Sequence, residues 1–327
     1  MDLNEFNRTV QWRKEIALDQ KRQAAKFRRH TKEIHNCPIC QSIKRKKFVE
    51  IYQYPYFECS QCGHLYCGTP PDDNELKKLY SSINNENVES SQGKIYIDGD
   101  LFDKRVKKIA LPKAQFVTDR INAAGLWVDL GAGVGDLVIA AGSLGWESIG
   151  YESDRAEVEF GVSKGARLHH EFIDFNFDLP FLKKAKVVSM INVLEHLSDP
   201  MLAVSSIATW MQKNSYFLFE VPRFPSISSL TNRCFPELAA RNIYSPDHLH
   251  LFSDYSAEIM AKNANLEIIS TWFFGQDAYE LIGNALSVGN FENHSLIDST
   301  LKIINDLQQV IDKNNLSDTM LILAKRK

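Results

Sequence analysis

The sequence predicts an α/β fold: an open, mostly parallel sheet with helices on both faces, preceded by a small cysteine-bearing module. An apolar run at 127–130 ends in glycines, and a second apolar run follows at 137–141. This is the pattern of a buried strand, a tight turn and a packed helix. Further apolar runs of strand length then alternate with helical patterns, as expected when helices join parallel strands.

The turn after the first strand has the composition of a nucleotide-binding loop. Gly131, Gly133 and Gly135 alternate with small residues, and glycine allows positive φ and a close approach of backbone N–H groups to a ligand. A dinucleotide fingerprint requires glycine at the sixth position, which is Asp136 here, and no Lys-Ser/Thr pair of a phosphate-binding loop follows. NAD is therefore the disfavoured alternative.

With Asp129 two residues ahead of the glycines, the loop resembles the first motif of class I S-adenosylmethionine (SAM)-dependent methyltransferases. Glu152 ends the next strand candidate, seventeen residues past Gly135, where an acidic side chain binds two ribose hydroxyls. The resemblance extends to the segment 172–175 and to 192–197, which is similar to the family's fourth motif and the Glu-His pair after it. It implies a Rossmann-like class I methyltransferase sheet of seven strands, the last one antiparallel. The cofactor-binding residues that it implies are Asp129, Gly131, Ala132, Gly133, Gly135, Asp136, Glu152, Asp174, Phe175 and Asn192.

Two Cys-x-x-Cys pairs lie between the N-terminus and this domain. The pairs Cys37/Cys40 and Cys59/Cys62 are separated by 18 residues, the spacing of a zinc ribbon in which each tight turn supplies two thiolates. Four thiolates leave no open position on the metal, so the Zn²⁺ is expected to be structural. Cys67 and, less strongly, His64 are substitute ligands.

We divide the chain into four parts. Residues 1–36 are expected to form a basic helix, 37–80 the zinc-binding module, 81–100 a linker, and 101–327 the methyltransferase domain with a helical insertion near 275–318. Within that insertion an apolar stripe at helical spacing indicates core packing or a homodimer contact. The stripe consists of Ile297, Leu301, Ile304, Leu307 and Ile311.

Charge is unevenly distributed along the chain. Residues 1–47 carry 13 Lys/Arg against five Asp/Glu, whereas the remainder carries 25 against 36. The basic start keeps an RNA methyltransferase open as the alternative function, although the acidic body would repel a phosphate backbone. No apolar run is long enough to span a membrane and the first residues lack the core of a signal peptide, so a cytoplasmic protein without membrane partners is expected.

Candidates for the catalytic base follow the fourth strand and the long excursion at 223–247. They are Glu195, His196 and His248, with His248 favoured because residues directly after the fourth strand more often contact SAM. The cysteine pairs together with the stretch 248–253 resemble bacterial methyltransferases of sugars and secondary metabolites. This resemblance implies a small-molecule acceptor, sugar-linked or nucleotide-linked, in carbohydrate biosynthesis. It leaves C-, O- and N-methylation open, and a non-catalytic SAM-binding protein is a further alternative.

Overall fold

The computed structural model describes residues 10–80, 97–121, 124–289 and 296–327. Its centre is a seven-stranded sheet in the order β10-β11-β8-β7-β4-β5-β6, in which β11 runs antiparallel to both of its neighbours. The predicted sheet, with its antiparallel last strand, is therefore confirmed. The strands are β4 (Leu126–Leu130), β5 (Glu147–Glu152), β6 (Leu168–His170), β7 (Ala185–Ile191), β8 (Tyr216–Pro222), β10 (Leu266–Phe274) and β11 (Thr319–Arg326).

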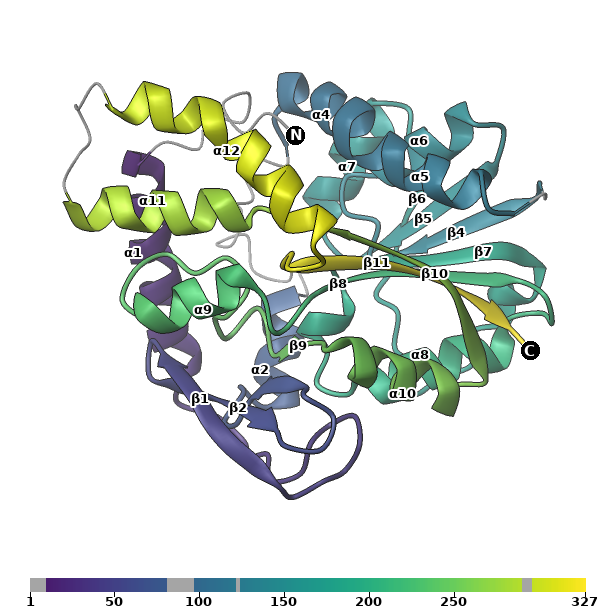
Figure 1. Ribbon diagram of the computed structural model, residues 1–327. Coiled ribbons are helices and arrows are strands. Elements are labelled where there is room, and N and C mark those ends of the chain that lie inside the picture. Colours follow the sequence, from purple (N-terminus) through teal and green to yellow (C-terminus); the bar gives the residue numbers. More distant parts are fainter. Residues whose placement is uncertain (1–9, 81–96, 122–123, 290–295) are drawn as a thin grey trace.

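Helices cover both faces of this sheet (Figure 1). In that view α4, α5, α6 and α7 lie above the strands, and α8 and α10 lie below them. The covering helices are α4 (Gly99–Arg105), α5 (Leu111–Thr118), α6 (Asp136–Ser143), α7 (Arg155–Ser163), α8 (Pro200–Trp210) and α10 (Asp254–Asn263). The helical segment before the first strand runs on through Pro112. A π-helical stretch, Val106–Ala110, joins α4 to α5, and Pro112 stands in the first turn of α5.

The two faces of the sheet have separate apolar cores. Trp127 and Val187 face α5 and α6 in one core, and Val128 and Val188 face α8 and α10 in the other. The alternation follows from the pleat, because successive residues of a strand point to opposite faces. Two short 3-10 helices, η4 (Pro180–Lys184) and η5 (Leu194–His196), flank β7.

The cysteine-bearing module forms a second sheet, β1-β2-β3-β9. Its fourth strand comes from far along the chain, because β9 is only His250–Leu251 and pairs with β3 at Leu65 and Tyr66. The cysteines also share the core that covers the lower face of the large sheet. The module and the domain are thus joined across the predicted boundary, and the linker expected at 81–100 falls largely outside the described residues. The other elements of this region are β1 (Arg45–Ile51), β2 (Tyr54–Cys59), β3 (Leu65–Cys67) and α2 (Asp73–Tyr80).

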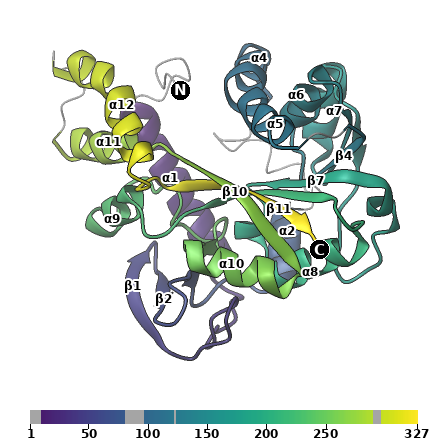
Figure 2. The same ribbon diagram turned by 45° about the vertical axis from the view of Figure 1, so that its right-hand side comes forward.

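Four helices pack beside the end of the sheet. Helix α1 (Val10–Phe27) contacts α11 (Asp277–Gly289), which in turn contacts α9 (Ile227–Cys234) and α12 (Leu296–Lys313). Figure 2 shows α1, α9, α11 and α12 grouped on one side, opposite α4 and α5. Within the apolar stripe of α12, Ile304 is buried against Tyr279, whereas Leu307 is 42 % exposed. No helix in the described part of the chain has the length and apolarity that a membrane span requires.

Candidate functional site

A chamber of about 1680 Å³ opens at the carboxyl ends of β4, β5, β7 and β8, which is where open α/β sheets bind their ligands. Its walls come from the glycine loop, from α1, from the 239–248 segment and from α11. The volume exceeds the roughly 300–1,000 Å³ of a pocket for one drug-sized ligand. The chamber is therefore large enough for a nucleoside cofactor and an acceptor together.

The glycine loop adopts a backbone that other residues rarely adopt. Gly131, Gly133 and Gly135 have φ of 71°, 53° and 77°. A Cβ on Gly131 would lie 2.6 Å from Val193 Cγ2, so this position needs glycine for space as well as for φ. The loop leads into α6 and presents its backbone to the chamber, whereas the Cβ direction of Gly135 points to Ala166.

Glu152 is the hydrogen-bond acceptor around which the loop is ordered. Its Oε2 accepts from the backbone N–H of Gly133 at 2.9 Å, and its Oε1 accepts from the N–H groups of Ser153 and Asp154 at 2.6 and 2.8 Å. Each carboxylate oxygen has two lone pairs, so Oε1 is fully used and Oε2 retains capacity for a ribose hydroxyl. Glu152 therefore lies beside the glycine loop, where the nucleotide-binding role expected for it requires it to be.

Asp129 lies on the floor of the chamber and is buried. Burial, followed by the charges of Asp136 and Glu152, raises the pKa of Asp129 to about 7, against a lowering by the hydroxyl of Ser189. Ser189 Oγ donates to Asp129 Oδ1 and itself accepts from Trp127 Nε1 at 2.8 Å. This chain of hydrogen bonds fixes the acidic side chain between β4 and β7.

The remaining predicted cofactor residues lie around the same chamber. Asp136 accepts from its neighbour's backbone N–H and lies 3.7 Å from the buried guanidinium of Arg105. Asp174 accepts from the backbone and side chain of Asn176, and Phe175 packs against the lower core. Of the ten predicted positions, Gly135 alone is absent from the chamber lining.

A buried ion pair in the chamber was not predicted from the sequence. Lys113 Nζ of α5 lies 2.7 Å from Glu220 Oε2 at the end of β8, and both side chains are at most 7 % exposed. Asn192 donates from Nδ2 to Glu220 Oε1 at 3.1 Å and has a left-handed φ of 53°. In the sequence, the sign that could have pointed to this pair is the charged Glu220 near the end of an apolar strand, directly before Val221-Pro222.

The candidate base residues are brought together. Glu195, His196 and His248 each offer a donor atom within 4.8 Å of the other two. The imidazole rings of His196 and His248 are 4.9 Å apart in an edge-to-face arrangement. Both histidines line the chamber, whereas Glu195 is fully buried behind them. Burial raises the pKa of Glu195 to about 7 and holds the pKa of His248 well below its ordinary value.

Helix α1 forms a wall of the chamber, which the sequence did not reveal. Arg13 is buried and pairs with Glu280 at 2.9 Å, and it donates to Asn284 Oδ1 at 2.6 Å. Gln20 donates to the carbonyl of Ala240 and accepts from its N–H, at 2.7 and 3.0 Å. These contacts fix the helix to the body, so that other residues of α1 face the chamber.

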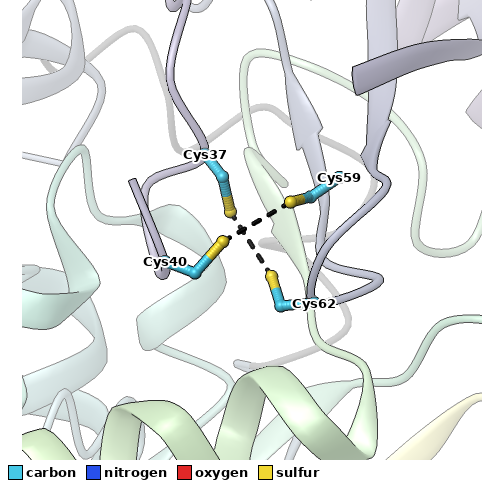
Figure 3. A group of neighbouring side chains, drawn as sticks. All are labelled: Cys37, Cys40, Cys59 and Cys62. Carbon is cyan, nitrogen blue, oxygen red and sulfur yellow. Dashed lines mark hydrogen bonds between the residues drawn. The ribbon is translucent and has the colours of Figure 1, made fainter. Parts of the chain in front are cut away.

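The four predicted zinc ligands converge (Figure 3). The sulfur atoms of Cys37 and Cys62 are 3.6 Å apart and those of Cys40 and Cys59 are 3.5 Å apart. A disulfide would need about 2.05 Å, whereas a tetrahedral zinc with bonds of about 2.3 Å places its sulfurs roughly 3.8 Å apart. The donor set and its spacing therefore fit zinc.

Neither substitute ligand belongs to this group. Cys67 is buried among the tyrosines of the module, in a different core from the four cysteines. His64 lies 3.2 Å from His250 through their ring nitrogens, and burial keeps its pKa well below the ordinary value. A neutral, buried His64 serves the packing between β3 and β9.

Together, the strand order, the glycine loop and the acidic residue after the second strand define a SAM-binding α/β protein. A family model for the methyltransferase domain matches residues 102–271, just over half of the chain. The chain belongs to this methyltransferase family and is a SAM-dependent methyltransferase. The comparison with curated proteins finds no match.

Solved methyltransferase structures are similar to this chain at low identity. A SAM-dependent methyltransferase from Archaeoglobus fulgidus is 17 % identical, with 69 % of this chain and 99 % of that one covered and a TM-score of 0.46. Magnesium protoporphyrin IX methyltransferase from Synechocystis, with bound S-adenosylhomocysteine, is 12 % identical, with coverages of 74 % and 97 % and a TM-score of 0.48. Geranyl diphosphate C-methyltransferase from Streptomyces coelicolor is 13 % identical, with coverages of 76 % and 91 % and a TM-score of 0.42.

Proposed function

We propose that this enzyme transfers the methyl group of SAM to a polyhydroxylated small molecule, a sugar or a sugar-linked metabolite. The observation that carries the proposal is one chamber, larger than a cofactor alone requires, with the glycine loop at one end and two imidazoles among amides and aromatic rings at the other. In that arrangement SAM lies along the loop and the acceptor lies between α1 and the histidines.

The cofactor end supplies the contacts that a nucleoside needs. The carboxylate of Glu152 accepts from a ribose hydroxyl through Oε2, Asp174 and Phe175 contact the adenine, and the loop backbone approaches the amino-acid part. Asp129, Asp136 and Asn192 add negative or polar groups near the cationic end of SAM. This assignment follows the position of each residue around the chamber.

The acceptor end is lined by groups that bind hydroxyls and sugar faces. Gln23 of α1 has a buried side-chain oxygen to which none of the described residues donates a hydrogen bond, and an acceptor hydroxyl supplies that partner. Trp12 and Tyr244 offer aromatic faces, and Asn242 a further amide, around the same space. Two cations at this end form ion pairs with carboxylates: Arg13 with Glu280, and Lys32 with Asp73 at 2.8 Å.

His248 is the proposed base, with His196 beside it. The Nδ1 of His248 lies 3.1 Å from the carbonyl of Asn242; a carbonyl only accepts, so Nδ1 carries the proton and Nε2 the lone pair. The depressed pKa keeps the ring neutral and able to take a proton from an acceptor hydroxyl or amine. Methyl transfer then forms the bond to the acceptor atom as the sulfonium bond breaks.

Zinc is the second cofactor that we propose, at Cys37, Cys40, Cys59 and Cys62. Four thiolates satisfy its coordination completely, so its contribution is to the fold and not to methyl transfer. We propose no RNA-binding role for α1, because two of its cations lie in ion pairs: Arg13 with Glu280, and Lys21 with Glu237 at 3.1 Å.

A kinetic comparison of two variants tests the base. His248→Asn should lower turnover roughly a hundredfold and leave SAM affinity nearly unchanged, because a base acts only in the transition state. His170→Asn is the matched control, since that histidine is exposed. A parallel loss of SAM affinity would make His248 a structural residue, and unchanged turnover would remove it from the mechanism.

A further inference from the structure

We propose that Glu195, His196 and His248 form a binding site for a divalent first-row transition metal ion at the acceptor end of the chamber. Two imidazoles and a carboxylate form the protein ligand set of thermolysin-type zinc sites and of non-haem iron sites. The site is distinct from the four-cysteine cluster, and unlike that cluster it keeps coordination positions open. Metal binding here is independent of which acceptor the enzyme methylates.

Glu195 is the residue that most clearly requires a partner. Its side chain is fully buried, and neither carboxylate oxygen has a hydrogen bond within the described part of the chain. His196 Nε2 lies 3.9 Å from Oε1, which is too far for a hydrogen bond. A buried, unpaired carboxylate is costly, and buried charges in proteins are paired or coordinate metals. A cation between Glu195 and the histidines provides that partner.

Both histidines are oriented as metal ligands usually are. His196 Nδ1 lies 2.8 Å from the carbonyl of Asp247, and His248 Nδ1 lies 3.1 Å from the carbonyl of Asn242. Because carbonyls accept, each neutral ring has its proton on Nδ1 and its lone pair on Nε2. A backbone carbonyl that fixes the tautomer through the remote nitrogen is the ordinary support of a metal-bound histidine.

The backbone holds the three residues in one rigid frame. Glu195 and His196 belong to η5, directly after β7, and His248 directly precedes Leu249 and β9. The N–H of Leu249 donates to the carbonyl of Glu195 at 2.7 Å. His250 Nε2 lies 2.9 Å from the carbonyl of Leu197 and fixes the same two segments a second time. The donors are therefore held near one another before any ligand binds.

The three ligand atoms are slightly farther apart than the ligands of a bound metal. Ligand atoms at about 2.0–2.2 Å from a metal lie roughly 3–3.6 Å from one another, whereas those of Glu195, His196 and His248 lie within 4.8 Å of one another. Small side-chain rotations close this difference. Nearby charges are paired with one another: Glu220 with Lys113, and Arg241 with Asp318. Glu195 has no Lys or Arg partner within the described part of the chain, which favours a cation at this site.

A bound metal uses the Nε2 lone pairs that would otherwise take a proton. The metal-bound state and the proton-accepting state of His248 therefore exclude each other. Metal binding must accordingly be measured directly, and not through turnover.

The test is a titration of full-length protein whose cysteine cluster is already loaded with zinc. Co²⁺ is the spectroscopic probe and Zn²⁺ the calorimetric one. We expect one further equivalent of metal per chain, and a cobalt spectrum with weak ligand-field bands but without the intense thiolate bands of a cysteine site. Glu195→Gln and His248→Asn should each weaken this second site by roughly a hundredfold or more.

Two controls separate the site from general metal binding. Glu171→Gln removes an exposed carboxylate of the same chamber, and His169→Asn removes an exposed histidine; both should retain the second equivalent. Circular dichroism and SAM binding verify that the Glu195→Gln and His248→Asn proteins are folded. If one of them is not, His196→Asn is measured in its place.

The proposal is wrong if the zinc-loaded protein takes up no second equivalent, or if Glu195→Gln and His248→Asn bind it as tightly as the parent. Methyl transfer by the metal-free site decides the proposed function separately. A protein that methylates an acceptor but binds no second metal loses only this inference.

Discussion

At the scale of single residues, the glycine loop sets the strictest requirement. Gly131 combines a φ of 71° with a Cβ direction that meets Val193 at 2.6 Å. Gly131→Ala should lower stability by about 1–3 kcal/mol and weaken SAM binding, because the loop must shift to admit the methyl group. Denaturant unfolding and calorimetric SAM titration measure the two effects.

Gly145→Ala is the control for backbone strain. Gly145 has a φ of 89°, and no atom of residues 10–80, 97–121, 124–289 or 296–327 lies within 4 Å of its Cβ position. The Gly145→Ala variant should be less stable than the parent protein but should bind SAM with the same affinity. Equal SAM affinity in the Gly131 and Gly145 variants would show that the loop does not approach the cofactor.

Asp129 predicts a pH dependence of stability in the SAM-free protein. Its folded pKa of about 7 lies above the ordinary value of 3.8, so its contribution is present below about pH 4 and is lost as pH rises to 7. One pKa unit corresponds to about 1.4 kcal/mol, so the loss is on the order of 4 kcal/mol. Asp129→Asn should therefore gain stability relative to the parent as pH rises from about 4 to about 7.

Urea unfolding at both ends of that range checks the sign. The exposed Asp178 provides the control, because Asp178→Asn should not change the difference between the two pH values. A parent protein that gains stability relative to the Asp129→Asn variant as pH rises would contradict the buried, proton-binding state of Asp129.

At the scale of elements, the docking of α1 depends on one buried ion pair. Arg13 and Glu280 are 4 % and 2 % exposed. Arg13→Ala leaves the carboxylate of Glu280 buried without its cation, and should cost about 3–5 kcal/mol. Replacing both residues by Met should cost less than Arg13→Ala alone, because no charge is then stranded.

The exposed pair Lys21–Glu237 on the same helix is the control. Lys21→Ala should change stability by at most about 1 kcal/mol. Thermal unfolding compares the three variants. Equal, small effects of Arg13→Ala and Lys21→Ala would mean that α1 is not anchored through Arg13.

The sequence predicted the elements well where one strand or helix carried its own signal. The apolar runs at 127–130 and 137–141 lie in the strand and the helix expected, β4 and α6, because apolar periodicity is a local signal. It missed β9, whose two residues form a strand only against β3. It also missed the Lys113–Glu220 pair, since two residues on separate elements meet only through the tertiary fold. The candidate site was predictable for the residues that follow strands in known motifs, and not for the wall that α1 supplies.

At the scale of the whole molecule, the cysteine cluster is part of the main core. Cys37, Cys59 and Cys62 pack in the same cluster as Val188 and Phe219 of the sheet. Loss of zinc should therefore destabilise the entire chain, since thiolate–metal bonds supply folding free energy. Cys59→Ser should lower the single melting transition and weaken SAM binding, whereas Cys234→Ser, at an exposed thiol, should do neither.

Scanning calorimetry with metal analysis distinguishes the outcomes. A separate low-temperature transition in Cys59→Ser, with the main transition unchanged, would show that the module unfolds by itself. Absence of zinc from protein prepared without chelators would show that the four cysteines do not hold this metal.

The proposed methyl transfer is tested by following the methyl group itself. The purified protein is incubated with isotopically labelled SAM, a panel of sugars and nucleotide-linked sugars, and bulk RNA in the same tube, and mass spectrometry locates the label. We expect one labelled methyl group on a small polyhydroxylated acceptor, with an equal amount of S-adenosylhomocysteine formed, and no label on RNA. Label in RNA with unmodified small molecules would contradict it.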